Sequence, residues 1–114
     1  MKTALLASRQ LTTSAHATLI IAALAELGTV ELHHGAEGAA EQHAHCWAHE
    51  TGGAIVAHRP DWVKHGRAAG PMRGKDLISA ADNVLALWDG KSKGTANELR
   101  EAKRQGKRVR LILV

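Results

Sequence analysis

The chain has no phenylalanine and no tyrosine, and it has one cysteine and two prolines among 114 residues. The core must therefore be built from Leu, Ile, Val and Ala, with Trp47, Trp62 and Trp88 as its only large aromatic side chains. An alanine-rich core of this kind favours close packing of helices on a sheet. The single cysteine, Cys46, excludes a disulfide within the chain and fits a reducing compartment.

Long apolar runs are also missing. The run at residues 4–7 stops at Ser8 and is too short for the core of a signal peptide. The run at residues 15–27 is interrupted by polar side chains and is shorter than the roughly 18 residues that a membrane span requires. We therefore expect a cytoplasmic protein without membrane contact, folded as a single domain over residues 1–114.

Charge is divided unevenly along the chain, whose net charge is +4. Residues 1–58 carry two basic and five acidic side chains, whereas residues 59–114 carry thirteen basic and six acidic side chains. A basic half beside an acidic half indicates a localised anion site more than a nucleic-acid coat, which would spread its charge. Nucleic-acid binding stays as an alternative.

Apolar and polar patterns alternate between strand and helix. The predicted strands cover residues 3–7, 29–33, 54–57, 83–88 and 108–114, and the predicted helices cover residues 15–27, 37–51, 73–81 and 95–105. Gly28, Gly52-Gly53 and Gly106 are the predicted helix stops. This alternation predicts an α/β fold with three α/β/α layers, Rossmann-like, around a mainly parallel five-stranded sheet.

The stretch from His58 to Lys75 follows neither a helical nor a strand period. It holds both prolines, Trp62 and five of the fifteen Lys and Arg residues. We interpret it as a long loop, and long ordered loops in compact domains are usually functional. It is predicted to be an anion-binding lid over the sheet.

Ligands of parallel α/β sheets bind outside the carboxyl ends of the strands, and Ser8, Gly35, His58 and Asp89 mark four of those ends. The turn from Gly35 to Ala39 joins a strand to a helix, where small residues let backbone N–H groups approach a phosphate. After the fourth strand, Gly94 can open the backbone, and Thr95 can cap a helix while offering its hydroxyl to an anion. Glu98 would complete a capping box with Thr95.

Together these residues resemble a known family. Ser8-Arg9, the Gly35-to-Ala39 turn, the run Gly66-Arg67-Ala68-Ala69-Gly70-Pro71-Met72-Arg73 after Asp61-Trp62, and Gly94-Thr95 resemble the SLOG superfamily of Rossmann-like domains, in particular its YspA-type branch. The resemblance covers nearly the whole chain and implies a nucleotide or nucleotide-derivative ligand across the strand ends. It also implies a homodimer.

The resemblance assigns roles to individual residues. Ligand contacts are expected from Ser8, Arg9, Gly35, Ala36, Gly38, Arg67, Gly70, Arg73, Gly94 and Thr95. The LOG enzymes of this superfamily split nucleoside 5′-monophosphates at the N-glycosidic bond, and Arg73 and Glu98 fall at their catalytic arginine and glutamate. Arg73 would pair with phosphate, and Glu98 would stabilise an oxocarbenium-like centre or hold a ribose hydroxyl.

The chain departs from the family pattern at several positions. Ala7 stands for a glycine, Ala40 for an acidic residue, and Gly74 for an Asn or Lys. These departures affect turnover more than binding, so we expect nucleotide binding as a sensor or binding domain and do not assign catalysis. The alternatives are a phosphoribohydrolase that uses Arg73 and Glu98, and a basic module that binds protein or nucleic acid.

The remaining polar and aromatic residues receive plainer interpretations. His45 and His49 share a helix face, but the spacing lacks the Glu of a zincin, so we expect surface histidines and neither a metal nor a cofactor. His58 and His65 flank the predicted loop and are candidates for phosphate contact or acid–base work. Trp62 is expected to pack beneath the loop, with stacking on a base as the alternative.

Overall fold

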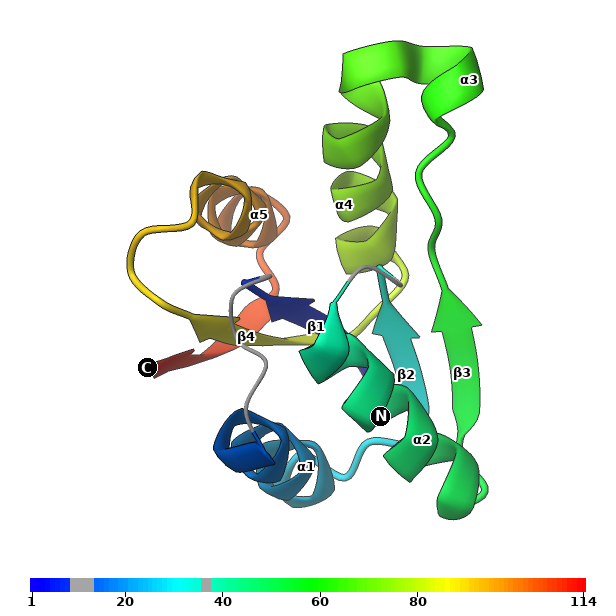
Figure 1. The fold of residues 1–114 in the computed structure, drawn as a ribbon, viewed down its shortest axis with the longest axis vertical. Coiled ribbons are helices and arrows are strands. Elements are labelled where there is room, and N and C mark those ends of the chain that lie inside the picture. Colours follow the sequence, from blue (N-terminus) through cyan, green and yellow to red (C-terminus); the bar gives the residue numbers. More distant parts are fainter. Residues whose placement is uncertain (9–13, 36–37) are drawn as a thin grey trace.

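Five parallel strands form one sheet in the order β3-β2-β1-β4-β5 (Figure 1). The structure is a computed structural model and describes residues 1–8, 14–35 and 38–114. The strands are β1 (Lys2–Ala7), β2 (Glu31–His34), β3 (Ala54–Ala57), β4 (Asn83–Trp88) and β5 (Arg108–Leu113). The predicted α/β class and three-layer Rossmann-like architecture are confirmed, and the sheet is entirely parallel.

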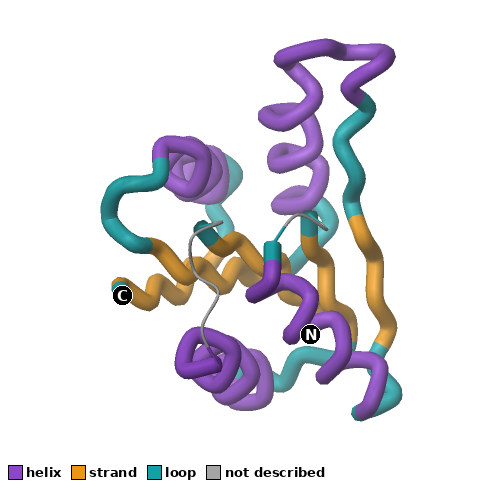
Figure 2. Tube along the Cα trace, viewed as in Figure 1, coloured by secondary structure: helices purple, strands orange, loops and turns teal. Residues whose placement is uncertain are grey.

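Helices cover both faces of the sheet (Figures 1 and 2). They are α1 (Ser14–Glu26), α2 (Ala39–Glu50), the single turn α3 (Trp62–His65), the 3-10 turn η1 (Gly66–Ala68), α4 (Ala69–Ser79) and α5 (Lys93–Arg104). One core lies between the sheet and α1 with α2, and a second core lies between the sheet and α4 with α5. Alternate residues of β1 serve the two cores, since Leu5 belongs to the first and Leu6 to the second. The central strands are consequently buried on both faces.

Glycine ends three of the helices in the same way. At the end of α1, the Thr29 N–H donates to the Leu24 carbonyl and the Gly28 N–H donates to the Ala25 carbonyl, with Gly28 at φ 63°. This is the Schellman arrangement, which needs a left-handed residue. Gly52 after α2 and Gly106 after α5 adopt the same conformation, so the predicted stops are confirmed.

The order of the strands places a reversal beside β1. The chain passes from β1 to β2 and β3 in one direction and then crosses back to β4 on the other side of β1. In open parallel sheets such a reversal leaves a crevice at the carboxyl ends of the two strands that flank it, here β1 and β4. Ser8, which follows β1, and Asp89, which follows β4, stand at this edge.

The predicted loop from His58 to Lys75 is the main error of the sequence interpretation, because most of this stretch is helical. Asp61 caps α3 by accepting from the Lys64 N–H at 3.0 Å, and α4 begins at Ala69, four residues before the predicted start. Pro71 lies in the first turn of α4, where a backbone N–H has no partner within the helix, so it does not interrupt the helix. Figure 1 shows α3 at the outer end of α4, away from the sheet.

The start of α5 also differs from the prediction. Ser92, and not Thr95, is the N-cap, since its side chain accepts from the Thr95 N–H at 3.5 Å. The Asp89 carboxylate accepts from the N–H groups of Lys91 and Ser92, both at 2.8 Å, and these bonds lower the pKa of Asp89. Helix α5 therefore begins at Lys93, two residues before the predicted start, and the Thr95 side chain does not cap it.

None of the helices in the described part of the chain is both long enough and apolar enough to cross a membrane.

Candidate functional site

A cleft of about 510 Å³ lies at the carboxyl edge of the sheet, mainly between α4 and α5. This volume falls within the range of sites that bind small molecules. Two helical stripes line the cleft, with Gly70, Arg73, Gly74 and Leu77 on α4, and Gly94, Asn97, Glu98 and Glu101 on α5. Each stripe follows the i, i+3, i+4, i+7 spacing of one helix face. At the strand ends the lining passes over Leu5 and Ala7 of β1 to Glu41 of α2.

Arg73 reaches from α4 to the end of β2. Its Nη1 donates to the Gly35 carbonyl oxygen at 2.7 Å, which joins residues 38 positions apart in the sequence. A Cβ on residue 35 would overlap with that same nitrogen, so any larger residue there would force the tip of the guanidinium to shift. The guanidinium is therefore fixed beside the turn that follows β2. The bond to Gly35 uses one of the five N–H donors of a guanidinium.

Gly74 serves a second close approach, between α4 and α5. A Cβ on residue 74 would lie 3.3 Å from Cγ and 3.5 Å from Oε2 of Glu98. The Glu98 carboxylate thus rests against the α4 residue that follows Arg73. Glycine at position 74 lets an acid and a base from different helices line the same cleft.

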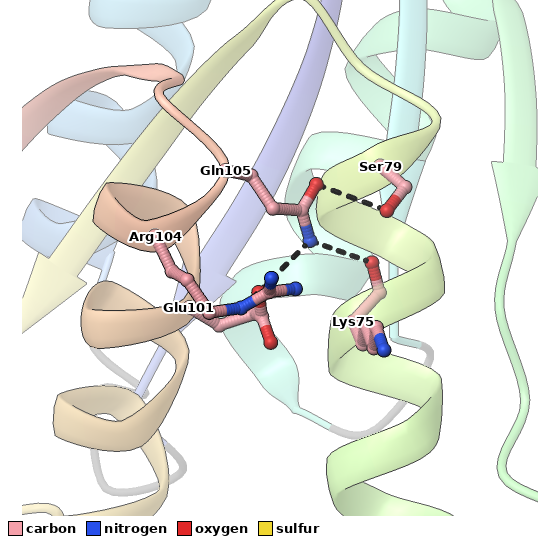
Figure 3. Close-up of polar contacts among 5 residues, drawn as sticks. All are labelled: Lys75, Ser79, Glu101, Arg104 and Gln105. Atoms are coloured by element: carbon pink, nitrogen blue, oxygen red, sulfur yellow. Dashed lines mark hydrogen bonds and ion pairs between the residues drawn. The ribbon is translucent and has the colours of Figure 1, made fainter.

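Gln105 clamps the carboxyl-terminal parts of α4 and α5 together (Figure 3). Its Oε1 accepts from the Ser79 hydroxyl at 2.9 Å, while its Nε2 donates to the Lys75 carbonyl at 3.3 Å and to Glu101 Oε2 at 3.2 Å. Arg104 donates to the same carboxylate at 2.7 Å and, with Gln105, lowers the pKa of Glu101. The clamp sets the spacing of the two helices that wall the cleft.

Ser8 and Thr95 meet at the reversal point of the sheet. Their hydroxyl oxygens are 3.2 Å apart, and both side chains are buried. The Ser8 N–H donates to the Leu87 carbonyl at 3.1 Å, which ties the end of β1 to β4. Thr95 lines the cleft, and Ser8 contacts the Thr95 side chain from the end of β1. The first N–H groups of α5 lack partners within the helix, and the helix dipole adds partial positive charge there.

Six of the predicted site residues line the cleft, and the others that the structure describes lie outside its lining. Gly35, Gly70, Arg73, Gly94, Thr95 and Glu98 all line the cleft. Gly38 is the N-cap of α2, and Arg67 is exposed on η1, so neither belongs to the lining. Arg9 and Ala36 lie outside the described residues.

The sequence interpretation did not select Ser92, Asn97, Glu101 or Lys75, which also line the cleft. Asn97 and Glu101 repeat at helical spacing with Gly94 and Glu98, and this signal was present in the sequence. Ser92 is missing from the predicted site because the predicted N-cap is Thr95. Lys75 lies within the predicted helix of residues 73–81, but nothing in its local sequence marks it as a cleft residue.

Four of the eight histidines form two pairs around β2. His33 Nδ1 is 2.8 Å from His58 Nε2, and His34 Nε2 is 2.9 Å from His45 Nδ1. His34 also lies 3.7 Å from Glu41. His45 thus contacts β2, in contrast to the predicted surface position. Among residues 1–8, 14–35 and 38–114, no group of three or more His, Cys, Asp or Glu side chains is placed to hold a metal ion.

Burial lowers the pKa of His33 and of His58. The nearby Glu31 carboxylate opposes this effect at His33, and the His33 ring lowers the pKa of His58 further. Asp76 raises the pKa of His58, and Arg73 and His34 lower it. The 2.8 Å contact also requires one of the two nitrogens to accept a hydrogen bond, which a doubly protonated pair cannot provide.

Three basic residues near the carboxyl end have partners within the protein. Lys107 Nζ donates to the Ala81 carbonyl at 2.8 Å, Arg104 pairs with Glu101, and Arg110 pairs with Glu26 of α1. Part of the positive charge in this half of the chain therefore serves helix and sheet packing.

A solved structure establishes the class of the protein. The crystal structure of TM1055, a structural-genomics target, matches with a TM-score of 0.70 over 95% of this chain and 71% of the TM1055 chain, at 22% sequence identity. With its reversal point and strand-end cleft, the chain is an α/β protein of the Rossmann-like type.

A sequence relative establishes the family. The Gene 61 protein of Mycobacterium phage D29 is 39% identical over 85 residues, which cover 69% of this chain and 67% of the phage protein. No protein-family model matches the chain. The chain belongs to the family of the phage Gene 61 protein.

Substitution of Gly35 by Ala should displace the Arg73 guanidinium and remove its hydrogen bond. Hydrogen bonds to charged groups contribute about 1.5–3 kcal/mol, so Gly35→Ala and Arg73→Ala should each lower the free energy of unfolding by an amount of this order. In the double variant the added methyl no longer meets the guanidinium, and the loss should be close to that of Arg73→Ala alone. Urea unfolding of the four proteins measures the coupling. Strictly additive losses would contradict the contact.

The histidine pair should make stability depend on pH. A lowered pKa in the folded state means that the unfolded chain binds more protons, so stability is full above about pH 6.5, the ordinary histidine pKa, and is lost as the pH falls toward the folded values. We expect the free energy of unfolding to decrease from pH 7 to pH 5. The decrease should be smaller in His58→Asn. His43→Asn, on the exposed face of α2, is the control. Equal slopes for wild type and His58→Asn would contradict the assignment.

Proposed function

We propose that the chain binds a phosphorylated nucleotide or nucleotide derivative in the cleft between α4 and α5, as a SLOG-type sensor or binding domain. The observation that carries the proposal is that the Arg73 cation and the start of α5, with Gly94 and Thr95, line one cleft at the strand ends. A cation and a helix start at one edge suit an anion such as phosphate. The resemblance of the Gly66-to-Arg73 run to the SLOG superfamily supports a nucleotide as the molecule that carries this phosphate.

The anion end of the cleft is built from fixed groups. Arg73 is held by Gly35, and Thr95 is buried against Ser8. A site whose donors are already positioned loses little conformational entropy when it binds a ligand. The Glu98 and Glu101 carboxylates line the same cleft and suit the hydroxyl groups of a ribose, since a carboxylate accepts hydrogen bonds.

A binding experiment compares two arginines, Arg67 of η1 and Arg73 of α4. Isothermal titration of the full chain with AMP, GMP, CMP, UMP and ADP-ribose should reveal a ligand whose affinity falls about tenfold or more in Arg73→Gln, because a charge-assisted contact contributes about 1.5–3 kcal/mol. Arg67→Gln makes the same charge change outside the cleft lining and should bind as wild type does. Arg73→Lys keeps the positive charge at this position. Circular dichroism of each variant checks that folding is retained.

The binding proposal fails if no phosphorylated nucleotide in this panel binds. It also fails if Arg67→Gln and Arg73→Gln weaken binding equally. Affinity that appears only for oligonucleotides and falls steeply with salt would instead favour the nucleic-acid alternative.

A second candidate function is hydrolysis of the N-glycosidic bond of a nucleoside 5′-monophosphate. The observation that favours it is the position of the Glu98 carboxylate against Gly74, beside the arginine that would hold the phosphate. In this reaction the bond from C1′ to the base nitrogen breaks, the water oxygen bonds to C1′, and one water proton goes to the departing base. The Glu98 carboxylate would stabilise the positive charge that develops at C1′.

Chromatographic detection of free base tests this reaction. If the chain is a hydrolase, AMP should yield adenine and ribose 5-phosphate, and Glu98→Gln should reduce the rate about a hundredfold or more, since such electrostatic groups contribute about 10²–10³ in rate. Glu50→Gln makes the same charge change at the exposed end of α2, outside the cleft lining, and should keep the wild-type rate. Absence of free base from all four monophosphates, with binding intact, would leave the chain a binding domain.

A further inference from the structure

Only three side chains in this protein offer a large aromatic plane, because Phe and Tyr are absent. Two of these tryptophans have structural roles. Trp47 packs against the core formed by α1 and α2, and Trp88 donates from Nε1 to the Ser92 carbonyl at 3.0 Å. Trp62 differs from both, since it lines the cleft while 51% of its surface stays exposed.

Trp62 is held at the outer end of the cleft. It is the first residue of α3, whose cap by Asp61 fixes the turn. The ring edge lies against α4, because a Cβ on Gly70 would be 3.4 Å from Trp62 Cη2. The indole therefore rests on the glycine face of α4, and the rest of its surface is available at the cleft.

The cleft thus has different chemistry at its two ends. The Trp62 ring lies over Gly70, near the start of α4. Arg73 follows three residues later, about 4.5 Å further along the helix axis, and its side chain extends from there to the end of β2. An aromatic surface and a cation in this order match a ligand that carries a planar ring at one end and an anion at the other.

We propose that Trp62 is the stacking platform for the base of the bound nucleotide. This inference rests on the proposed nucleotide binding and adds to it the recognition of the base, with Gly70 as the residue that lets the ring lie against α4. Stacking uses the π face that every base presents, so the platform distinguishes a nucleotide from a sugar phosphate more than one base from another. The departure from the sequence interpretation, in which Trp62 packs beneath a loop, follows from its exposure.

The test uses AMP and ribose 5-phosphate as paired probes on the full chain. Calorimetric titration should show AMP binding weakened about ten- to a hundredfold in Trp62→Ala and largely restored in Trp62→Phe, as expected for a lost stacking contact. Ribose 5-phosphate lacks a base, so its affinity should change less than about twofold in either variant. AMP should also quench tryptophan fluorescence in wild type and in Trp47→Phe but not in Trp62→Phe.

The outcomes separate the platform from the site itself. Equal weakening of both probes in Trp62→Ala would assign the ring to support of the cleft wall, and unchanged AMP affinity would remove it from recognition; both results overturn the inference while nucleotide binding stands. A changed sedimentation coefficient with unchanged AMP affinity would place Trp62 in a contact between proteins, which also overturns it. If wild type binds neither probe nor any other nucleotide of the titration panel, the proposed function fails and the platform fails with it.

Discussion

One hydrogen bond, from Arg73 Nη1 to the Gly35 carbonyl, holds the cleft in its shape. It crosses the carboxyl edge of the sheet and ties the α4 layer to the end of β2. The bond keeps the guanidinium at the strand ends, in contrast to the mobile charge of a fully solvated arginine side chain. A mobile charge of this kind contributes little to binding, because ordering a long side chain costs conformational entropy. The backbone carbonyl thus determines where the positive charge of the site lies.

The other contacts of the cleft set its width. Gln105 joins α4 to α5 at one end, and Gly74 brings the Glu98 side chain against α4 further along. The hydroxyl pair of Ser8 and Thr95 then fixes the start of α5 over the reversal point of the sheet. These contacts link elements that are distant in the sequence, and each uses a small or uncharged residue to position a larger one. The cleft is therefore a product of packing between α4 and α5 more than of any single loop.

Local signals in the sequence were sufficient for the architecture. The residues expected at the strand ends, Ser8, Gly35, His58 and Asp89, each directly follow a strand, because short β-branched runs and glycine stops act locally. The stretch from His58 to Lys75 could not be assigned in this way. Its two prolines and its lack of a hydrophobic period predict a loop, whereas Gly70 and Pro71 lie in the first turn of α4, where Gly70 leaves space for Trp62. The pairing of His33 with His58 depends on strand register, which spacing along the chain does not reveal.

The Gly74 and Glu98 contact has a consequence for how sequences of this family can change. The two positions share one volume, so a larger residue at position 74 requires the side chain at position 98 to move or shrink first. In this chain the Glu98 side chain fills the space beside Gly74 from the opposite helix. The residue that position 74 can hold therefore depends on the residue at position 98, so the two positions must be changed together when the cleft is redesigned.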